Sequence, residues 1–159
     1  MAINIKFQAK ILNCELMDKI IFHFNQKNKN EFDIKIKDEI LNLFPIISGY
    51  KNLEMSIGIF DNYLFENLKD LLTEKIDLKK IKFLELILDT LKNLFETELI
   101  YFEDLIVKDT KDKGKLFIKN FEEINGLEIL DKIILMQYNE NLINNVNILI
   151  KMMDYRNKQ

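Results

Sequence analysis

The sequence has no tryptophan, one cysteine, one proline and four glycines in 159 residues. A single cysteine, Cys14, excludes an internal disulfide and a cysteine zinc cluster, so we expect a reducing compartment. So few glycines and prolines argue against an all-β fold, which needs many tight turns. No apolar run reaches the roughly 18 residues of a spanning helix, and the first ten residues lack the pattern of a signal peptide. These absences predict a helical protein inside the cell that does not enter a membrane.

Charge and length restrict the partners that we expect. The net charge is −3, which offers no electrostatic reason to bind nucleic acid and suits a basic peptide better. The chain is long enough for one domain with a sizeable core. With 48% apolar and 31% charged residues, the composition is globular rather than disordered.

Apolar residues recur at intervals of three and four along most of the chain, which predicts amphipathic helices. Residues 3–12 also alternate like a strand, but nothing nearby supplies a strand partner, so we favour a short helix. Pro45 removes a backbone donor within one pattern and predicts a kink or an early stop. The helices that we expect cover residues 3–12, 16–26, 33–48, 55–60, 64–74, 77–96, 99–107, 116–124, 128–138 and 141–154, with loops at 27–32 and 108–115.

The strongest helical pattern covers residues 77–96, and the rest of the chain can be arranged around it. Its apolar residues form one broad face, so we expect a helix buried on two sides. Asp77 is suited to cap its N-terminus. The remaining polar stripe consists of Lys82, Glu85, Asp89, Lys92, Asn93 and Glu96. A buried helix with one polar stripe suits a stack of helices that presents the stripe to a partner.

Three segments share a short internal pattern, with cores LMDKI, LFENL and ILDKI that begin at Leu16, Leu64 and Ile129. Each core is followed by a loop and a longer helix. Repeats of about 40–47 residues built from two or three helices are typical of armadillo and HEAT proteins. Chance similarity between amphipathic helices is the alternative explanation.

The segment LDKIILMQYNEN, at 130–141, resembles the last armadillo repeat of importin alpha, the adaptor that carries cargo with basic localisation signals. IFDNYLFENLKDLL resembles the second helix of the preceding repeat and LDTLKNLFE resembles its long helix, in which Asn93 matches the family's asparagine. ILNCELMDKIIFHF and DEILNLFPIISG resemble the repeat before that. The resemblance implies an all-α fold, an α-solenoid of about three armadillo-like repeats.

The chain departs from that family at positions that matter for binding. Tryptophans and asparagines line the family's groove, where lysine and arginine stems of the signal stack between the indoles. This sequence has no tryptophan and has Leu41 and Pro45 where the first repeat would offer tryptophan and asparagine. The basic segment that binds importin beta and the early repeats of the major site have no counterpart.

The polar stripe of 77–96 holds the candidate binding residues Glu85, Asp89 and Asn93. Residues at i, i+4 and i+8 lie near one face of a helix. The carboxylates there can bind lysine or arginine, while Asn93 can hold the backbone of an extended peptide. Asp38 matches an acidic position of the family and completes the predicted set. A plain solvated helix face is the alternative.

No catalytic, metal or cofactor site is predicted. The one histidine, His23, lies in the apolar run IIFHF, and a packed histidine is the simpler reading. Asp109, Asp112 and Gly114 lack the spacing and the closing glutamate of an EF-hand. DKGK lacks the ending of a phosphate loop. We therefore expect neither an enzyme nor a cofactor.

Together these observations predict one armadillo-like domain over 1–159, with repeats at about 3–49, 51–97 and 116–155 and an insertion at about 99–118. The expected function is an importin-alpha-like scaffold in cytoplasm and nucleus that binds signal-bearing cargo or an export receptor. The alternative is a structural or pathogen-encoded helical interaction protein with no transport role. The apolar face of the first repeat also predicts self-association through the N-terminal end.

Overall fold

The computed structural model describes residues 15–101, 116–136 and 138–158, and within these ranges it contains helices and no strand. The predicted helix at 3–12, Cys14 and the loop at 108–115 lie outside them. The helices are α2 (Glu15–Asn25), α3 (Glu31–Leu41), α4 (Phe44–Ser48), α5 (Leu53–Ile59), α6 (Asn62–Asp77), α7 (Ile81–Ile100), α9 (Phe117–Glu123), α10 (Gly126–Met136) and α11 (Glu140–Asn157). The prediction of an all-helical fold is confirmed for these residues.

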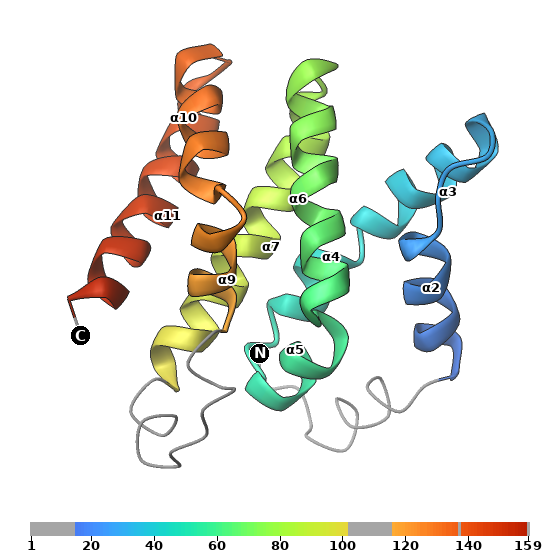
Figure 1. The fold of residues 1–159 in the computed structure, drawn as a ribbon, viewed down its shortest axis with the longest axis horizontal. Coiled ribbons are helices and arrows are strands. Elements are labelled where there is room, and N and C mark those ends of the chain that lie inside the picture. The colour runs from blue at the N-terminus through green and yellow to red at the C-terminus, as the bar shows by residue number, and fades with distance from the viewer. Residues whose placement is uncertain (1–14, 102–115, 137, 159) are drawn as a thin grey trace.

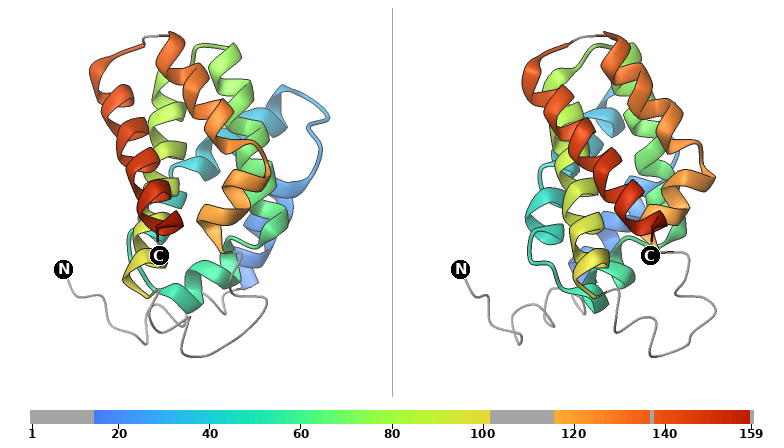
Figure 2. Two further views of the ribbon diagram at one scale, coloured as in Figure 1. Left: turned by 60° about the vertical axis from the view of Figure 1, so that its left-hand side comes forward. Right: turned by 90° about the vertical axis from the view of Figure 1, so that its left-hand side faces the viewer.

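The longer helices stand in two parallel rows (Figures 1 and 2). Helix α6 contacts α2 on one side and α10 on the other, and these three form one row. Helix α7 contacts α3 and α4 on one side and α11 on the other, and these form the second row. The contacts between α2 and α3, α6 and α7, and α10 and α11 join the rows. The short helices α5 and α9 both pack against α7, so α7 is the common neighbour of the fold.

A continuous apolar core fills the space between the rows, and nearly every described helix contributes to it. Aromatic rings connect its parts. The ring of Phe44 packs edge-on against Phe24 of α2 and Phe60 after α5, with centroids 5.0 and 5.4 Å apart. Phe121 of α9 packs edge-on against Phe65 and Phe95. Each edge-to-face pair adds about 0.5–1.5 kcal/mol beyond the area that it buries.

Asparagine and aspartate side chains cap the start of four of these helices. In each case the side-chain oxygen accepts the backbone N–H three residues on, at 2.8–3.0 Å, which satisfies a donor that the first helical turn leaves unpaired. The four caps are Asn30, Asn52, Asp61 and Asn139.

The prediction that Asp77 caps the long helix is wrong, because α6 continues through Asp77 and α7 begins only at Ile81. Lys79 adopts a left-handed backbone with φ of 55°. The N–H of Lys79 then donates to the carbonyl of Ile76, and that of Lys80 to the carbonyl of Lys75. This Schellman arrangement ends α6, although the left-handed position usually holds glycine. Lysine there gives no sequence signal for the break.

Pro45 interrupts its helix as predicted. The chain leaves α3 at Leu41 and resumes as α4 at Phe44, where Pro45 occupies the first turn. Proline is tolerated there because the N–H that it lacks would have no partner within the helix. The chain between α2 and α5 therefore has two short helices, α3 and α4, whereas α7 is unbroken.

The chain turns sharply between α9 and α10, at Asn125 and Gly126. Asn125 takes a left-handed backbone with φ of 63° after α9, and α10 starts at Gly126. A side chain at Gly126 would lie 2.2 Å from the ring of Phe121, so the buried glycine allows α9 and α10 to approach each other closely.

Candidate functional site

The polar stripe on α7 is the surface that the sequence singled out, and the structure leaves it outside the core. Nine residues of α7 are buried, whereas Lys82 is exposed and the others of the stripe are half-exposed. Helix α7 contacts α4 and α11 within its row. Glu85 and Asp89 are one turn apart on it.

Burial changes the chemistry of Asp89. Partial desolvation raises the pKa of its carboxyl, and the charge of Lys92 partly opposes this rise. A carboxylate that has lost part of its hydration gains more than an exposed one when a cation reaches it. Further along the stripe, Glu96 already pairs with Lys51 at 2.6 Å. Glu85 and Asp89 are therefore the carboxylates of the stripe best placed to accept a cationic ligand.

Asn93 is occupied within the chain. Its side-chain amide donates to the carbonyl of Pro45 at 3.1 Å and to the hydroxyl of Ser48 at 3.3 Å. Ser48 is buried, and its hydroxyl in turn donates to the carbonyl of Phe44 at 2.7 Å. Asn93 thus attaches α4 to α7, at the place where Pro45 separates α4 from α3.

The structure does not bring Asp38 to the stripe. Its carboxylate pairs with the ammonium group of Lys75 on α6 at 2.6 Å, and Lys75 is fully buried. The same ammonium group lies 4.7 Å from the ring centre of Phe83. Asp38 therefore balances a buried charge among α3, α6 and α7, a task that sequence spacing did not reveal.

A second buried ionic pair lies at the other side of α7. Glu98 is 1% exposed and receives the backbone N–H of Ile118 at 3.4 Å, while Nε of Arg156 lies 3.5 Å from its other oxygen. Desolvation outweighs these partners and raises the pKa of Glu98 to about 7. Glu98 falls in the gap between the predicted helices 77–96 and 99–107, whereas α7 continues through it to Ile100.

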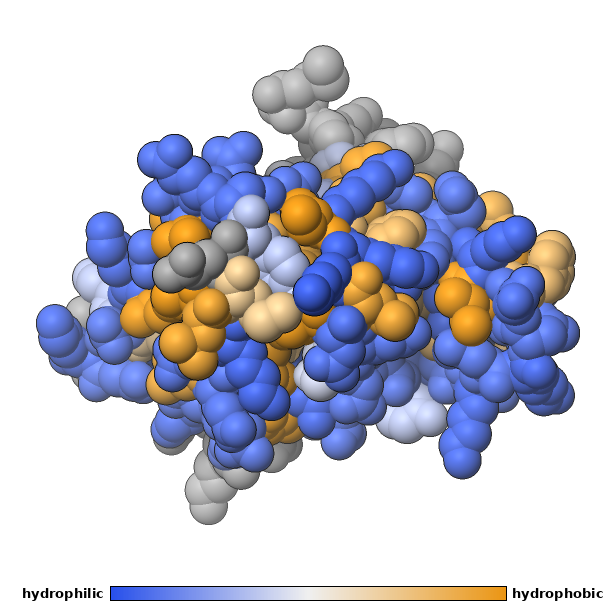
Figure 3. Space-filling view, turned by 90° about the horizontal axis from the view of Figure 1, so that it is seen from above, coloured by the Kyte–Doolittle hydropathy of each residue, from blue (hydrophilic) through white to orange (hydrophobic). Residues whose placement is uncertain are grey.

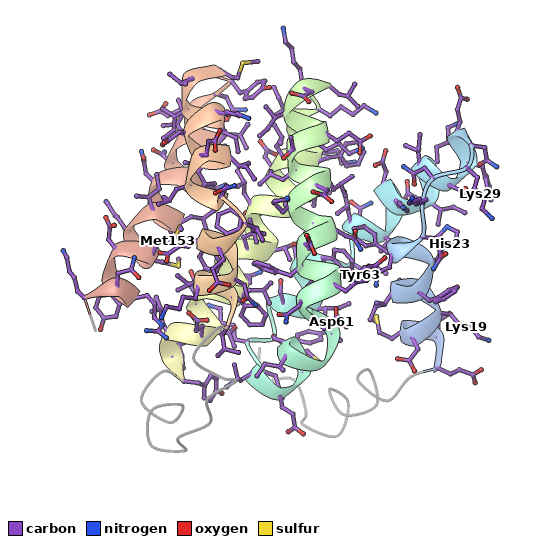
Figure 4. All side chains as sticks on the ribbon, in the orientation of Figure 1. Lys19, His23, Lys29, Asp61, Tyr63 and Met153 are labelled. Atoms are coloured by element: carbon purple, nitrogen blue, oxygen red, sulfur yellow. The ribbon has the colours of Figure 1, made fainter. Side chains whose placement is uncertain are left out.

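A polar pocket of about 360 Å³ lies between α6 and the α2–α3 region. The side-chain amide of Asn67 donates to Asn25 across it at 2.7 Å. Figure 4 shows Tyr63 on α6 and His23 on α2. Carboxylates of Asp70 and Glu74 line the pocket together with the ammonium group of Lys37. Charges of both signs therefore meet there, and they select no single class of ligand.

His23 is half-buried beside this pocket and lines a smaller one of about 150 Å³ with Asp33 and Lys37. Its Nε2 is buried and has no hydrogen-bond partner among the described residues. No group of three or more histidine, cysteine or acidic side chains in the described ranges is placed to hold a metal ion.

The exposed side of α3 carries an apolar groove of about 430 Å³, lined by Phe32, Lys35, Ile36, Glu39, Ile40 and Leu43. Phe32 is 68% exposed and Leu43 is 37% exposed. Figure 3 shows further hydrophobic side chains among the hydrophilic ones on the upper surface. The sequence predicted a loop at 27–32, which includes Phe32, and a helix at 33–48, so it did not reveal this groove.

Comparisons with known proteins add no assignment, since no protein-family model, curated protein or solved structure matches the chain. Among the described residues, no helix combines the length and hydropathy needed to cross a membrane.

Proposed function

We propose that the chain is an armadillo-like α-solenoid that binds an extended basic peptide, in the manner of the importin alpha adaptors that it resembles. The repeated order of helices supports this proposal. A short helix, a second helix and a long helix follow one another in α5–α6–α7 and again in α9–α10–α11. Like helices of the two units stand side by side, α6 beside α10 and α7 beside α11.

The observation that carries the binding proposal is the pair Glu85 and Asp89 on the polar stripe of α7. Both carboxylates are half-exposed and lie one turn apart. A peptide in extended form spaces alternate side chains about 6.6 Å apart, close to the 5.4 Å of one helical turn. Two basic side chains of such a peptide can therefore reach both carboxylates by charge-assisted hydrogen bonds.

The internal contacts of two of the four predicted binding residues argue against a binding role for them. Asn93 and Asp38 each have a partner inside the chain. We assign them to the scaffold, so that a substitution there would act on folding before it acts on a ligand. The proposed contacts are therefore Glu85 and Asp89, and the proposed partners are basic signal-bearing cargo or a transport receptor. No catalytic step is proposed.

The test is fluorescence anisotropy of a labelled peptide with two basic clusters, titrated with the full chain at low and at physiological salt. We expect saturable binding that weakens with salt. The double variant Glu85→Gln/Asp89→Asn should weaken binding about tenfold, because both charge-assisted contacts are lost. Circular dichroism of each variant verifies that the helices remain.

A matched control is Glu128→Gln/Asp131→Asn on α10, which removes the same charge from two exposed residues. This control should leave binding unchanged. An equal loss in both double variants would show that diffuse negative charge attracts the peptide. No binding at either salt concentration would refute the proposal.

The second candidate is a helical interaction protein with no role in transport. The groove on α3 favours it, because an apolar surface contributes nothing to the recognition of a basic peptide. This candidate would be supported if the basic peptide does not bind and the protein associates through α3.

A further inference from the structure

We infer that α3 forms a two-fold contact between two copies of this chain, with the two α3 helices packed antiparallel. The proposal does not depend on peptide binding. It rests on the shape, burial and charge order of the groove on α3.

The groove follows one side of α3 from Phe32 and continues to Leu43, two residues beyond the end of the helix, a length of about 16 Å at 1.5 Å per residue. The opposite side of the helix is already used. Leu41 is buried in the core, and Asp38 is paired with Lys75. A helix whose second side is also apolar normally packs against another element. Phe32, 68% exposed, lacks such cover among the described residues.

The apolar residues of the groove are arranged so that the grooves of two copies of the chain can pack against each other. In an antiparallel pair with the two-fold axis midway between Lys37 and Asp38, Phe32 of one copy lies level with Leu43 of the other. Large apolar side chains then meet at both ends of the contact. A two-fold interface always uses the same patch twice, so this self-complementarity is what it requires.

The charges of the groove favour the same arrangement. Lys35 and Glu39 are both exposed and line the groove one turn apart. Around that axis, Lys35 of one copy lies within one residue, about 1.5 Å along the helix, of the level of Glu39 of the other. The two-fold symmetry produces this lysine–glutamate contact twice in the dimer. A parallel pair would instead place each lysine beside a lysine and each glutamate beside a glutamate, which is repulsive.

The size of the contact sets its strength. One pair of helices buries less than the roughly 1,200 Å² of a standard stable interface. We therefore expect a reversible dimer that forms at high micromolar concentration. Sedimentation velocity of the full chain over about 10 µM to 1 mM covers that range.

Charge reversal tests the arrangement directly. Lys35→Glu alone and Glu39→Lys alone each place like charges together at both symmetric positions, so each should weaken the dimer about tenfold. Lys35→Glu/Glu39→Lys reverses both charges and should restore it. An equimolar mixture of the two single variants should form a heterodimer more readily than either variant forms a homodimer.

These outcomes separate a second copy from other occupants. A wild-type chain that stays monomeric up to 1 mM overturns the inference, and would leave the groove to residues 1–14 of the same chain or to another protein. A dimerisation strength that stays the same in all three variants overturns the inference as well, because the contact would then lie elsewhere. The substituted residues are exposed, and an unchanged circular dichroism spectrum shows that each variant folds.

Discussion

Two junctions hold the fold together, and each contains a buried ionic pair. The more buried partner is the cation in one junction and the carboxylate in the other. The N-terminal junction is where α2–α4 pack on α6 and α7, and it contains Lys75 and Asp38. The C-terminal junction is where α9–α11 pack on α7, and it contains Glu98 and Arg156. In the first, a fully buried cation meets a carboxylate at 2.6 Å. In the second, a buried carboxylate lies 3.5 Å from its cation.

The difference shows how closely a buried charge must be matched. Asp38 lies close enough to make a direct hydrogen bond with Lys75, and the ring of Phe83 faces the same ammonium group. Glu98 has a longer contact with Arg156 and one long hydrogen bond from Ile118. Its pKa of about 7 means that the proton competes with Arg156 near neutral pH. The C-terminal junction is therefore the one that responds to pH.

The largest expected effect is at the N-terminal junction. Asp38→Ala removes the partner of a fully buried ammonium group, and breaking such a pair costs about 3–5 kcal/mol. The free energy of unfolding, measured by urea denaturation at pH 7, should fall by this amount.

The matched control for this change is Asp38→Leu/Lys75→Met, which replaces the whole pair with apolar side chains of similar volume. We expect it to recover most of the loss, because no uncompensated charge remains. A loss below about 1 kcal/mol in Asp38→Ala would mean that the pair does not stabilise the junction.

The next effect is at the C-terminal junction and depends on pH. Folding raises the pKa of Glu98 from 4.5 to about 7, so the folded protein holds this proton more tightly than the unfolded chain. The stability that this proton provides is complete below pH 4.5 and is lost as pH rises to about 7. Glu98→Gln should remove that part of the pH dependence and stabilise the protein at pH 8 by up to about 3 kcal/mol.

Urea denaturation of wild type and Glu98→Gln at pH 4.5, 6 and 8 measures this effect. The two proteins should differ least at pH 4.5 and most at pH 8. A variant that is less stable at pH 8 would show that the ion pair with Arg156 outweighs the cost of burying the carboxylate.

The smallest expected effect concerns the hydrogen bonds that attach α4 to α7 in the N-terminal junction. Asn93→Ala removes two hydrogen bonds to α4, of which the acceptors are Pro45 and Ser48. At about 0.5–1.5 kcal/mol each, the loss should be about 1–3 kcal/mol. The thermal midpoint reports it, and Lys92→Ala on the same half-exposed stripe is the control. An unchanged midpoint would indicate that α4 is held by its apolar contacts alone.

Local patterns predicted much of this fold, since they depend on residues close in sequence. The helix faces and the break at Pro45 follow from apolar spacing and from the missing N–H. The error at Asp77 arose because a lysine ends α6 in a conformation that usually marks glycine.

The partners of the polar residues could not be predicted in the same way. Lys75 and Asp38 are 37 positions apart, and Asn93 and Pro45 are 48 apart. Nothing in local spacing shows that such residues meet. Two of the four predicted binding residues proved to be engaged in this way. The groove on α3 was not predicted, because Phe32 was assigned to the loop at 27–32.

The position of α7 has a consequence for how the protein unfolds. In a long array of repeats, each unit contacts only its neighbours, and the ends can open one unit at a time. Here α7 contacts α3, α4, α5, α6, α9 and α11, so neither end can separate without exposing the same helix. Loss of either flank therefore weakens the support of the other, and the chain behaves as one cooperative unit. Its slowest hydrogen exchange then belongs to the amides of α7.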